Sequence, residues 1–360
     1  MAGGLPVAET TDDTRFANIL VTGGCGFIGS NLIRVLTEEN LVPGLEFIAN
    51  LDALTYAGNR SNLADLEGDT RYRLIHADIC DAARMDNIFR HGQFDAVLHL
   101  AAESHVDRSL MGPEAFFRTN VMGTAVMLDA ARRHKVRRFV MVSTDEVYGS
   151  LPDDSASRFR ETTPLDPTSP YAASKAASDL AALSFAKSFG MDVVVTRSSN
   201  NYGPYQFPEK MIPLMTINAL NDQPLPVYGD GRNIRDWIHA RDHARGIVAA
   251  LFRGRAGAIY NLGAHNERRN LELVERILDI LQKPRSLIRF VTDRAAHDLR
   301  YAIDATRARE ELAWEPQADF GGAFEQTVRW YVDNRAWWEA IIHGPYRDYY
   351  RKLYGERLAG

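Results

Sequence analysis

A glycine-rich turn between an apolar run and an amphipathic stretch constrains the fold of this chain more than any other feature. The apolar run is Ile19-Leu20-Val21, the glycines are Gly23, Gly26 and Gly29, and residues 31–39 have helical periodicity. In a strand-turn-helix unit the first glycine permits a tight turn, the second lets the backbone approach a phosphate, and the third lets the helix pack closely. The sequence therefore predicts a β-strand, a phosphate-binding turn and a helix.

Apolar runs and helix-length amphipathic stretches alternate through the first half of the chain. This alternation predicts a Rossmann-type α/β fold, a doubly wound parallel sheet with its functional groups at the carboxyl ends of the strands. The expected strands are short and rich in β-branched residues; they are residues 19–21, 47–48, 96–98, 138–142 and 193–197. A long helix is expected over residues 115–133.

The second half is punctuated by prolines and predicts a smaller α/β domain that binds the substrate. We expect a loose tail at residues 1–15, a dinucleotide-binding domain at 16–199, a mainly substrate-binding domain at 200–345 and a C-terminal tail at 346–360. Residues 232–260 have a pattern that rejoins the first domain. The boundary between the two domains is therefore expected to be interleaved.

Charge and composition exclude several classes of function. The formal net charge of −5 argues against a nucleic-acid or anionic-membrane surface, since those partners require a positive field. Two unpaired cysteines, Cys25 and Cys80, are typical of a reducing compartment. Charged residues interrupt every apolar run well before the length of a membrane span, and residues 1–15 have no signal-peptide pattern. We therefore expect a cytoplasmic protein without a metal site.

The expected cofactor is NAD. Asp52 ends the second strand about twenty residues after the glycine turn, where a carboxylate binds ribose hydroxyls and repels a 2′-phosphate. The alternative is a turn-initiating aspartate, because Asp-Ala-Leu-Thr is acceptable turn chemistry. The expected cofactor contacts lie on the turn and at neighbouring strand ends; besides the three glycines and Asp52 they are Phe27, Ile28, Asp78, Ile79, Leu100, Ala101 and Ala102.

The catalytic candidates follow the fifth expected strand and open the helix beyond it. Tyr171 and Lys175 are four residues apart and share a helix face, so the ammonium can lower the pKa of the tyrosine and hold ribose hydroxyls of the cofactor. Thr144 can hydrogen-bond a substrate oxygen or cap the backbone. Asp145 and Glu146 would face opposite sides of a strand, so we expect them on the loop beyond it, where they can act as acid and base.

With these residues in view, the chain resembles the extended short-chain dehydrogenase/reductase superfamily and, within it, the dTDP-glucose 4,6-dehydratase family. The resemblance covers roughly residues 18–354. It is carried by Leu54-Thr-Tyr-Ala-Gly-Asn59, Ala101-Ala-Glu-Ser-His-Val-Asp-Arg-Ser109, Ser143-Thr-Asp-Glu-Val-Tyr-Gly149, Ser199-Asn-Asn-Tyr-Gly-Pro-Tyr-Gln206, Pro208-Glu-Lys210, Val227-Tyr-Gly-Asp-Gly231 and His297-Asp-Leu-Arg-Tyr301.

The resemblance implies dehydration of a nucleotide-linked sugar with tightly bound, recycled NAD. Tyr171, assisted by Thr144 and Lys175, would remove the 4-hydroxyl proton while C4 is oxidised. Glu146 would then remove the C5 proton and Asp145 would protonate the departing C6 hydroxyl. Reduction at C6 would give a 4-keto-6-deoxy sugar. Spacing alone would allow the two carboxylates to exchange roles.

The resemblance also implies a set of substrate contacts and a dimer. Ser104 and Thr144 are expected beside the sugar; the nucleotide contacts are expected at Asn200, Lys210, Pro226, Tyr228, Arg235, Asn270 and His297. A homodimer would pair helices at residues 115–133 and 171–189. The chain departs from the family pattern at Cys25, commonly alanine, at Ala295-Ala296 before the histidine, and in its acidic N-terminal extension.

Three other functions remain alternatives. A 4,6-dehydratase acting on a UDP- or CDP-sugar differs only in the base, which the sequence does not specify. A nucleotide-sugar 4-epimerase is less consistent with Asp145-Glu146, since related epimerases have a small residue there. A non-catalytic dinucleotide sensor has no need of Tyr171, Lys175, Thr144 or the acidic pair, so it is disfavoured.

Overall fold

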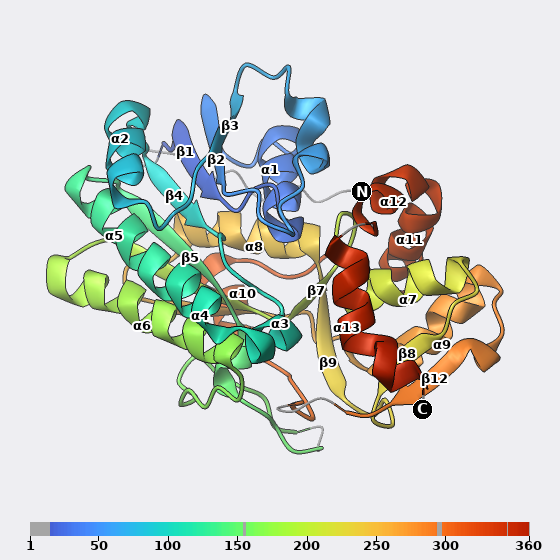
Figure 1. Cartoon of the computed structure of the whole chain (residues 1–360). Coiled ribbons are helices and arrows are strands. Elements are labelled where there is room, and N and C mark those ends of the chain that lie inside the picture. Colours follow the sequence, from blue (N-terminus) through green and yellow to red (C-terminus); the bar gives the residue numbers. More distant parts are fainter. Residues whose placement is uncertain (1–14, 154–155, 294–296, 344, 360) are drawn as a thin grey trace, which may run out of the picture.

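Figure 1 shows a computed structural model of the protein, which describes residues 15–153, 156–293, 297–343 and 345–359. The tail expected at residues 1–15 lies outside these ranges, apart from Arg15. Ala295 and Ala296, where the chain departs from the family pattern, also lie outside them.

The centre of the protein is a seven-stranded sheet of parallel strands. Its order is β3-β2-β1-β4-β5-β6-β10, and every neighbouring pair runs parallel. The strands are β1 (Asn18–Thr22), β2 (Phe47–Asp52), β3 (Tyr72–His76), β4 (Ala96–His99), β5 (Arg138–Thr144), β6 (Val193–Ser198) and β10 (Ile259–Leu262). The doubly wound sheet expected from the sequence is confirmed, and the order reverses between β1 and β4, which places the ligand crevice at their carboxyl ends.

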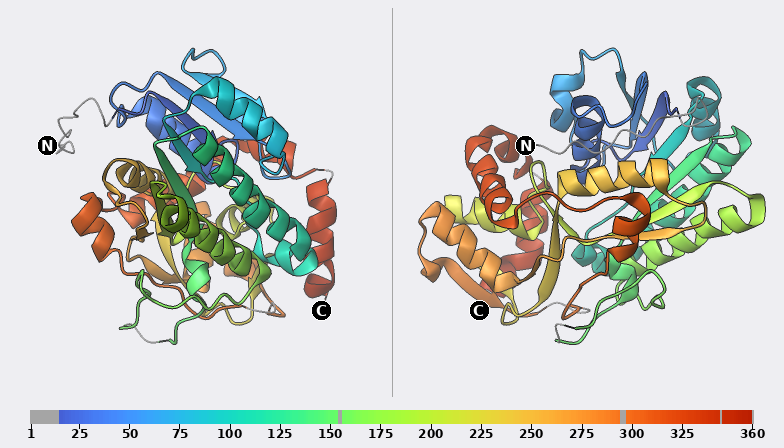
Figure 2. Two further views of the ribbon diagram at one scale, coloured as in Figure 1. Left: turned by 90° about the vertical axis from the view of Figure 1, so that its left-hand side faces the viewer. Right: turned by 180° about the vertical axis from the view of Figure 1, so that it is seen from behind.

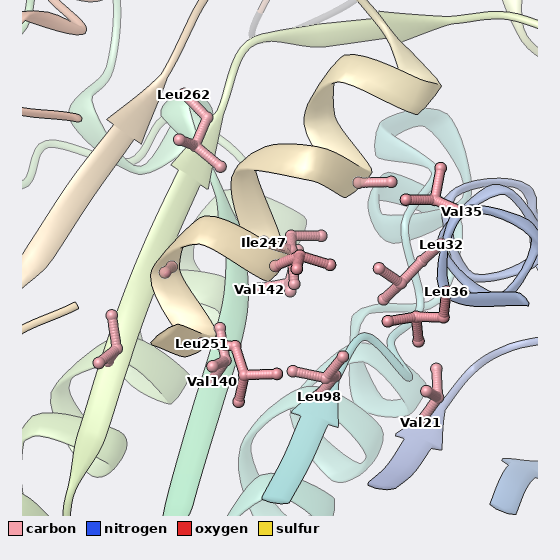
Figure 3. Packing of buried hydrophobic residues seen from close by; sticks show 14 of the residues in the cluster. Val21, Leu32, Val35, Leu36, Leu98, Val140, Val142, Ile247, Leu251 and Leu262 are labelled. Atoms are coloured by element: carbon pink, nitrogen blue, oxygen red, sulfur yellow. The ribbon is translucent and has the colours of Figure 1, made fainter. Parts of the chain in front are cut away.

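Helices cover both faces of this sheet, so its strands are buried on both sides (Figure 2). One face carries α1 (Phe27–Glu38), α8 (Ala240–Arg253) and α10 (Thr306–Leu312). Figure 3 shows Leu32, Leu36 and Ile247 of these helices among strand residues such as Val140. The other face carries α2 (Ala82–Gly92), α5 (Thr124–Arg133) and α6 (Pro170–Phe189).

The helix expected over residues 115–133 is interrupted by a wider turn. Helix α4 (Pro113–Phe116) continues into a π-helical segment, η3 (Phe117–Gly123), and then into α5. Inside this segment the Asn120 carbonyl accepts hydrogen bonds from the hydroxyls of Thr124 at 2.6 Å and Ser178 at 2.8 Å. These side-chain donors stabilise a carbonyl that the widened turn releases from the regular α-helical pattern.

The remaining elements form a second, smaller layer with its own core, seen on the right of Figure 1. A three-stranded sheet is built from β7 (Asn200–Tyr202), β9 (Ile234–His239) and β11 (Glu267–Arg269), and a two-stranded one from β8 (Leu225–Tyr228) and β12 (Ile288–Val291). The main helices are α7 (Met211–Leu220), α9 (Asn270–Leu281), α11 (Phe320–Asp333), α12 (Arg335–Ile341) and α13 (Pro345–Ala359). Four short helical pieces complete the described part of the chain: η2 (Arg60–Leu66), α3 (Val106–Met111) and η4 (Asp145–Tyr148) pack beside helices of the seven-stranded sheet, and η5 (Arg285–Leu287) precedes β12.

The chain passes back to the first sheet after residue 200. Helices α8 and α10 and strand β10 all pack with the seven-stranded sheet, although they follow β7 in the sequence. None of the helices in the described ranges is long and apolar enough to span a membrane.

The segment expected as a C-terminal tail is instead helical, since residues 346–359 belong to α13. Its tyrosines at spacing four lie on one face and contact the second layer. The hydroxyl of Tyr346 donates to the Pro208 carbonyl at 3.1 Å, and the hydroxyl of Tyr350 accepts from the Asn218 amide at 3.1 Å. These contacts, made with residues more than 100 positions away, stabilise the helix.

Candidate active site

The glycine turn after β1 has the geometry of a phosphate site. Gly23 has φ +71°, and a Cβ there would lie 2.8 Å from the backbone of Ala101. A Cβ on Gly29 would lie 2.2 Å from the Gly23 carbonyl oxygen. Helix α1 begins after Gly26 with no side-chain cap and no acidic residue in its first turn, so its first amides face the turn without a competing side-chain acceptor. This cradle fits a pyrophosphate.

Asp52 lies at the carboxyl end of β2 and is buried. Its two oxygens accept the backbone N–H groups of Cys25 at 2.9 Å and Leu54 at 2.8 Å. Burial raises the pKa of this carboxyl, and the two amides oppose that rise. Asp52 therefore initiates a turn and also ties the glycine turn to β2, while each oxygen keeps a lone pair for a ribose hydroxyl.

The other expected cofactor residues lie at the same edge of the sheet. The amides of Leu100 and Ala101 both donate to the Thr22 hydroxyl at 3.1 Å, which fixes the β4 exit beside the glycine turn. Asp78 accepts from the Cys80 amide at 2.9 Å. Phe27 and Ile28 form the first turn of α1, Ile79 is buried beneath η3 next to Gly123, and Ala102 follows β4.

Asp145 and Glu146 lie beyond the end of β5, in the 3-10 turn η4, as the sequence predicted. Thr144 is the last strand residue and caps this turn, because its hydroxyl accepts from the Glu146 amide at 3.3 Å. Asp145 is 1 % exposed, and its Oδ2 has no hydrogen-bond partner among the described residues. Glu146 is partly exposed, so the two neighbouring carboxyls lie in different surroundings.

The surroundings of Asp145 favour the protonated form of its carboxyl. Burial raises the pKa of its carboxyl well above the usual range, and the charges of Glu146 and Asp236 add to the rise. Arg235 opposes it, as does a hydrogen bond from Thr144. A buried acid beside a second carboxylate is the arrangement in which one group donates a proton and the other accepts one.

Tyr171 and Lys175 lie in the first turns of α6, which begins with Ser169 as its cap and Pro170 in its first turn. The Lys175 ammonium donates to the Val142 carbonyl at 2.8 Å. Burial lowers the pKa of Lys175 to about 8, against an upward effect of Asp179.

The expected lowering of the Tyr171 pKa by Lys175 is not found in this structure. Burial raises the pKa of the Tyr171 phenol, and the charges of Glu146 and Asp145 raise it further, while a hydrogen bond with Thr144 lowers it. The physical reason is that Tyr171 faces the acidic turn after β5, whereas the ammonium is bound to a strand carbonyl.

Sequence reasoning missed a buried ion pair beneath Lys175. Asp179 accepts from the Arg197 guanidinium at 2.9 Å, and both side chains are almost fully buried. Asp179 lies one turn after Lys175 on α6, and Arg197 is on β6, over the Tyr148 ring. The spacing of four from Lys175 to Asp179 was the available signal, because it places the carboxylate on the same helix face.

The residues that we expect to bind the substrate lie in several separate groups. The Lys210 ammonium donates to the Ser104 carbonyl at 2.9 Å. Arg235 lies over the Tyr301 ring at 4.2 Å, its guanidinium donates to the Asp298 carbonyl at 2.9 Å, and its charge acts on Asp145.

Tyr228 forms the remaining group with His297 and Tyr354. Its ring lies 5.8 Å from that of His297 and 6.1 Å from that of Tyr354. Pro226 lies two residues earlier on the same strand, β8. The sequence did not indicate Tyr354.

Two expected substrate residues present unsatisfied oxygens. The side-chain oxygens of Asn200, on β7, and Asn270, at the start of α9, are buried and have no hydrogen-bond partner in the described residues. A buried polar atom without a partner costs free energy, so these oxygens are suited to hydrogen-bond donors on a ligand.

The parallel sheet, the uncapped helix after a glycine turn, and the Thr144, Tyr171 and Lys175 set define a dinucleotide-dependent enzyme of the extended short-chain dehydrogenase/reductase class. Comparison with known proteins places it within that class. The sequence model of the family described as GDP-mannose 4,6 dehydratase matches residues 20–327. The chain belongs to this family of nucleotide-sugar 4,6-dehydratases.

Two curated relatives and a solved structure to which the chain is similar are dTDP-glucose 4,6-dehydratases. The chain is 45 % identical to one from Escherichia coli, over 94 % of this chain and 98 % of the relative. It is 49 % identical to one from Streptomyces niveus, over 90 % and 95 % of the two chains. The crystal structure of the dTDP-glucose 4,6-dehydratase DesIV from Streptomyces venezuelae, which contains NAD, matches with a TM-score of 0.87 and 49 % identity, covering 90 % of this chain and 99 % of that one.

Proposed function

We propose that this enzyme dehydrates dTDP-glucose to dTDP-4-keto-6-deoxyglucose, using a tightly bound NAD that is recycled in each turnover. The observation that carries the proposal is the acidic pair of η4, one carboxyl buried with a raised pKa and its neighbour partly exposed, beside Thr144 and Tyr171. Oxidation at C4 alone requires no such pair. Elimination of water requires both an acid and a base.

The residues of the glycine turn would hold the cofactor. The amides at the start of α1 would bind its pyrophosphate, and Asp52 would accept hydrogen bonds from its adenosine ribose. Lys175, in the first turns of α6, would hold the nicotinamide ribose. When bound, NAD accepts hydride from C4 of the sugar and returns it to C6, so that it is not consumed.

Tyr171 begins the reaction by removing the proton of the sugar 4-hydroxyl. Thr144 supports it in two ways, since its hydroxyl lowers the pKa of Tyr171 and can orient the 4-oxygen. The resulting 4-ketone acidifies the C5 proton.

Glu146 removes the C5 proton and Asp145 protonates the departing C6 hydroxyl, so that water leaves. The burial and raised pKa of Asp145 suit the acid role, because they favour the form that carries the proton that the leaving hydroxyl needs. Each positioned proton transfer contributes roughly a hundred- to ten-thousand-fold to the rate. A proton returned to C5 completes the product.

The nucleotide diphosphate is held by residues of the second layer. Lys210 and Arg235 supply positive charge, and Arg235 offers a planar pair of donors. Asn200, Asn270 and His297 supply further polar contacts, Pro226 and Tyr228 lie beside the base, and Ser104 lies beside the sugar. The buried side-chain oxygens of Asn200 and Asn270 support this assignment.

We also propose a cytoplasmic homodimer. Large apolar side chains are exposed along η3 and α6; Met122 is 61 % exposed, Leu180 59 % and Phe189 57 %. A second copy of this face would cover them. Light scattering of the purified enzyme should give twice the chain mass, and Met122→Glu should shift it toward the monomer. A monomeric mass for the unaltered enzyme at micromolar concentration would contradict the dimer.

The decisive experiment uses dTDP-glucose deuterated at C4. We expect the product to lack one water and to contain deuterium at C6, measured by mass spectrometry and NMR. UDP-glucose and CDP-glucose, tested in parallel, should turn over more slowly; faster turnover of either would assign a different nucleotide. A galactose-configured product would identify an epimerase, and unchanged substrate would refute the proposed function.

A further inference from the structure

Arg108, in α3, joins three parts of the chain that are distant in sequence. Its guanidinium lies 3.8 Å from the centre of the Tyr56 ring and 3.9 Å from that of Tyr349. Its Nε donates to Glu209 Oε2 at 2.8 Å, and the side chain of Glu209 is only 2 % exposed. Tyr56 follows β2 and Tyr349 belongs to α13, so the guanidinium lies between the first sheet domain and the C-terminal helix.

A second contact links the same two segments of the chain, but here the cation comes from the segment that contains Glu209. Lys210, the neighbour of Glu209, donates to the Ser104 carbonyl at 2.9 Å. Segment 104–108 therefore supplies one cation and one carbonyl, and segment 209–210 supplies one carboxylate and one cation. The two segments are held together by both contacts, immediately before α7 begins at Met211.

Aromatic contacts fix the residues that precede this pair. The Phe207 ring lies 5.6 Å from that of Tyr56 and 6.1 Å from that of Tyr346, both edge-on. The Tyr346 hydroxyl donates to the Pro208 carbonyl at 3.1 Å. Helices α3 and α13 lie side by side in Figure 1, and this segment is held where they meet.

Arg108 is one of two cations that offset the negative charge of the buried Glu209 carboxylate. Burial raises the pKa of Glu209, while Lys210, Arg108 and a hydrogen bond with Tyr56 lower it. The carboxylate thus has two cations within its field, and Arg108 is hydrogen-bonded to it. Lys210 has the larger charge effect of the two, so without the guanidinium the buried carboxylate, which is costly to leave unpaired, would draw that ammonium toward itself.

We propose that Arg108 is a positioning residue that occupies the Glu209 carboxylate and thereby keeps the Lys210 ammonium at Ser104, the position from which it binds the diphosphate of the substrate. The inference rests on the proposed function, in which Lys210 binds that diphosphate. Arg108 acts through Glu209 and Lys210 and has no part in the chemistry at C4, C5 or C6.

A double-mutant cycle tests the proposal. Arg108→Met should raise KM for dTDP-glucose about tenfold, with kcat changed by less than about threefold, because ground-state and transition-state binding are lost together. In the Glu209→Gln background, where the carboxylate that would capture Lys210 is replaced by a neutral amide, the same substitution should change KM by less than about threefold. A similar increase of KM in both backgrounds would overturn the proposal, since it would reflect lost packing.

A conservative variant separates charge from shape. Arg108→Lys retains the cation but loses the planar group between two rings, so KM should stay within about threefold of the unaltered enzyme. An Arg108→Lys variant as impaired as Arg108→Met would also refute the proposal. If Arg108→Met alone is insoluble, the double variant decides, because its KM must match that of Glu209→Gln.

An activity-independent readout separates this proposal from the proposed function. Thymidine diphosphate binding, measured by calorimetry, should weaken in Arg108→Met and recover in the double variant. Absence of turnover by the unaltered enzyme, with this binding pattern intact, would refute only the proposed function. Turnover by the unaltered enzyme, with diphosphate binding unaffected by Arg108→Met, would refute only the role of Arg108.

Discussion

Replacing Glu146 by glutamine should separate the steps of the proposed dehydration. The substitution removes a negative charge that raises the pKa of both Asp145 and Tyr171. Ionisation of Tyr171 becomes easier, so oxidation at C4 is not slowed. The amide cannot accept the C5 proton, and loss of a positioned base lowers the rate of elimination about 10²- to 10⁴-fold, equivalent to about 3–5 kcal/mol in the barrier.

Asp145→Asn is the matched comparison, because it removes the acid and leaves the base. Both variants should accumulate oxidised sugar and the near-ultraviolet absorbance of reduced nicotinamide. In deuterium oxide, Asp145→Asn should exchange the C5 proton, since Glu146 can still remove it, whereas Glu146→Gln should not. Mass spectrometry and NMR of the recovered sugar measure this exchange.

Two results would refute this reasoning. Exchange at C5 in Glu146→Gln but not in Asp145→Asn would reverse the roles of the two carboxyls. Elimination at the unaltered rate in Glu146→Gln would remove Glu146 from the base role altogether.

Other consequences of the structure are testable separately. Gly29→Ala should lose bound NAD, because its Cβ would lie 2.2 Å from a carbonyl oxygen, whereas Gly68→Ala, with nothing within 4 Å, should keep it; cofactor content measures both. Lys175, whose pKa burial lowers to about 8, is an ammonium below that pH and loses its charge above it, so kcat/KM should fall as the pH rises through about 8. A profile flat to pH ~10, the ordinary pKa of lysine, would contradict this. Asp179→Asn leaves the Arg197 charge buried without its partner and should destabilise the protein by about 3–5 kcal/mol in urea unfolding. Adding Arg197→Met should restore part of that loss; an additive loss would show that the pair is not coupled.

Much of the candidate site could be predicted because it follows from local pattern and sheet topology. A strand that ends at Thr144 must place Asp145 and Glu146 at the carboxyl edge of a parallel sheet. A helix that contains Tyr171 and Lys175 at spacing four must present both on one face. The structure confirms the turn after β5 and the start of α6 beside it.

Other properties depend on contacts between distant segments. The sequence indicated a lowered pKa for Tyr171 because a lysine was near, but burial and the facing carboxylates act in the opposite direction. Residues 346–359 have no strong helical pattern of their own, and the tyrosines of α13 find their partners on α7 and β8. Arg108 and Glu209 are 101 residues apart, so no local spacing links them.

The sequence by itself determined the class of fold and the glycine turn and indicated the candidate reacting groups, because these follow from patterns along single strands and helices. The tertiary structure alone decided which carboxyl is buried with a raised pKa, which guanidinium is hydrogen-bonded to Glu209 and which helix packs on the second layer. The reason is that desolvation and Coulomb interactions depend on distances in space between separate elements, and a single chain order is compatible with many such distances.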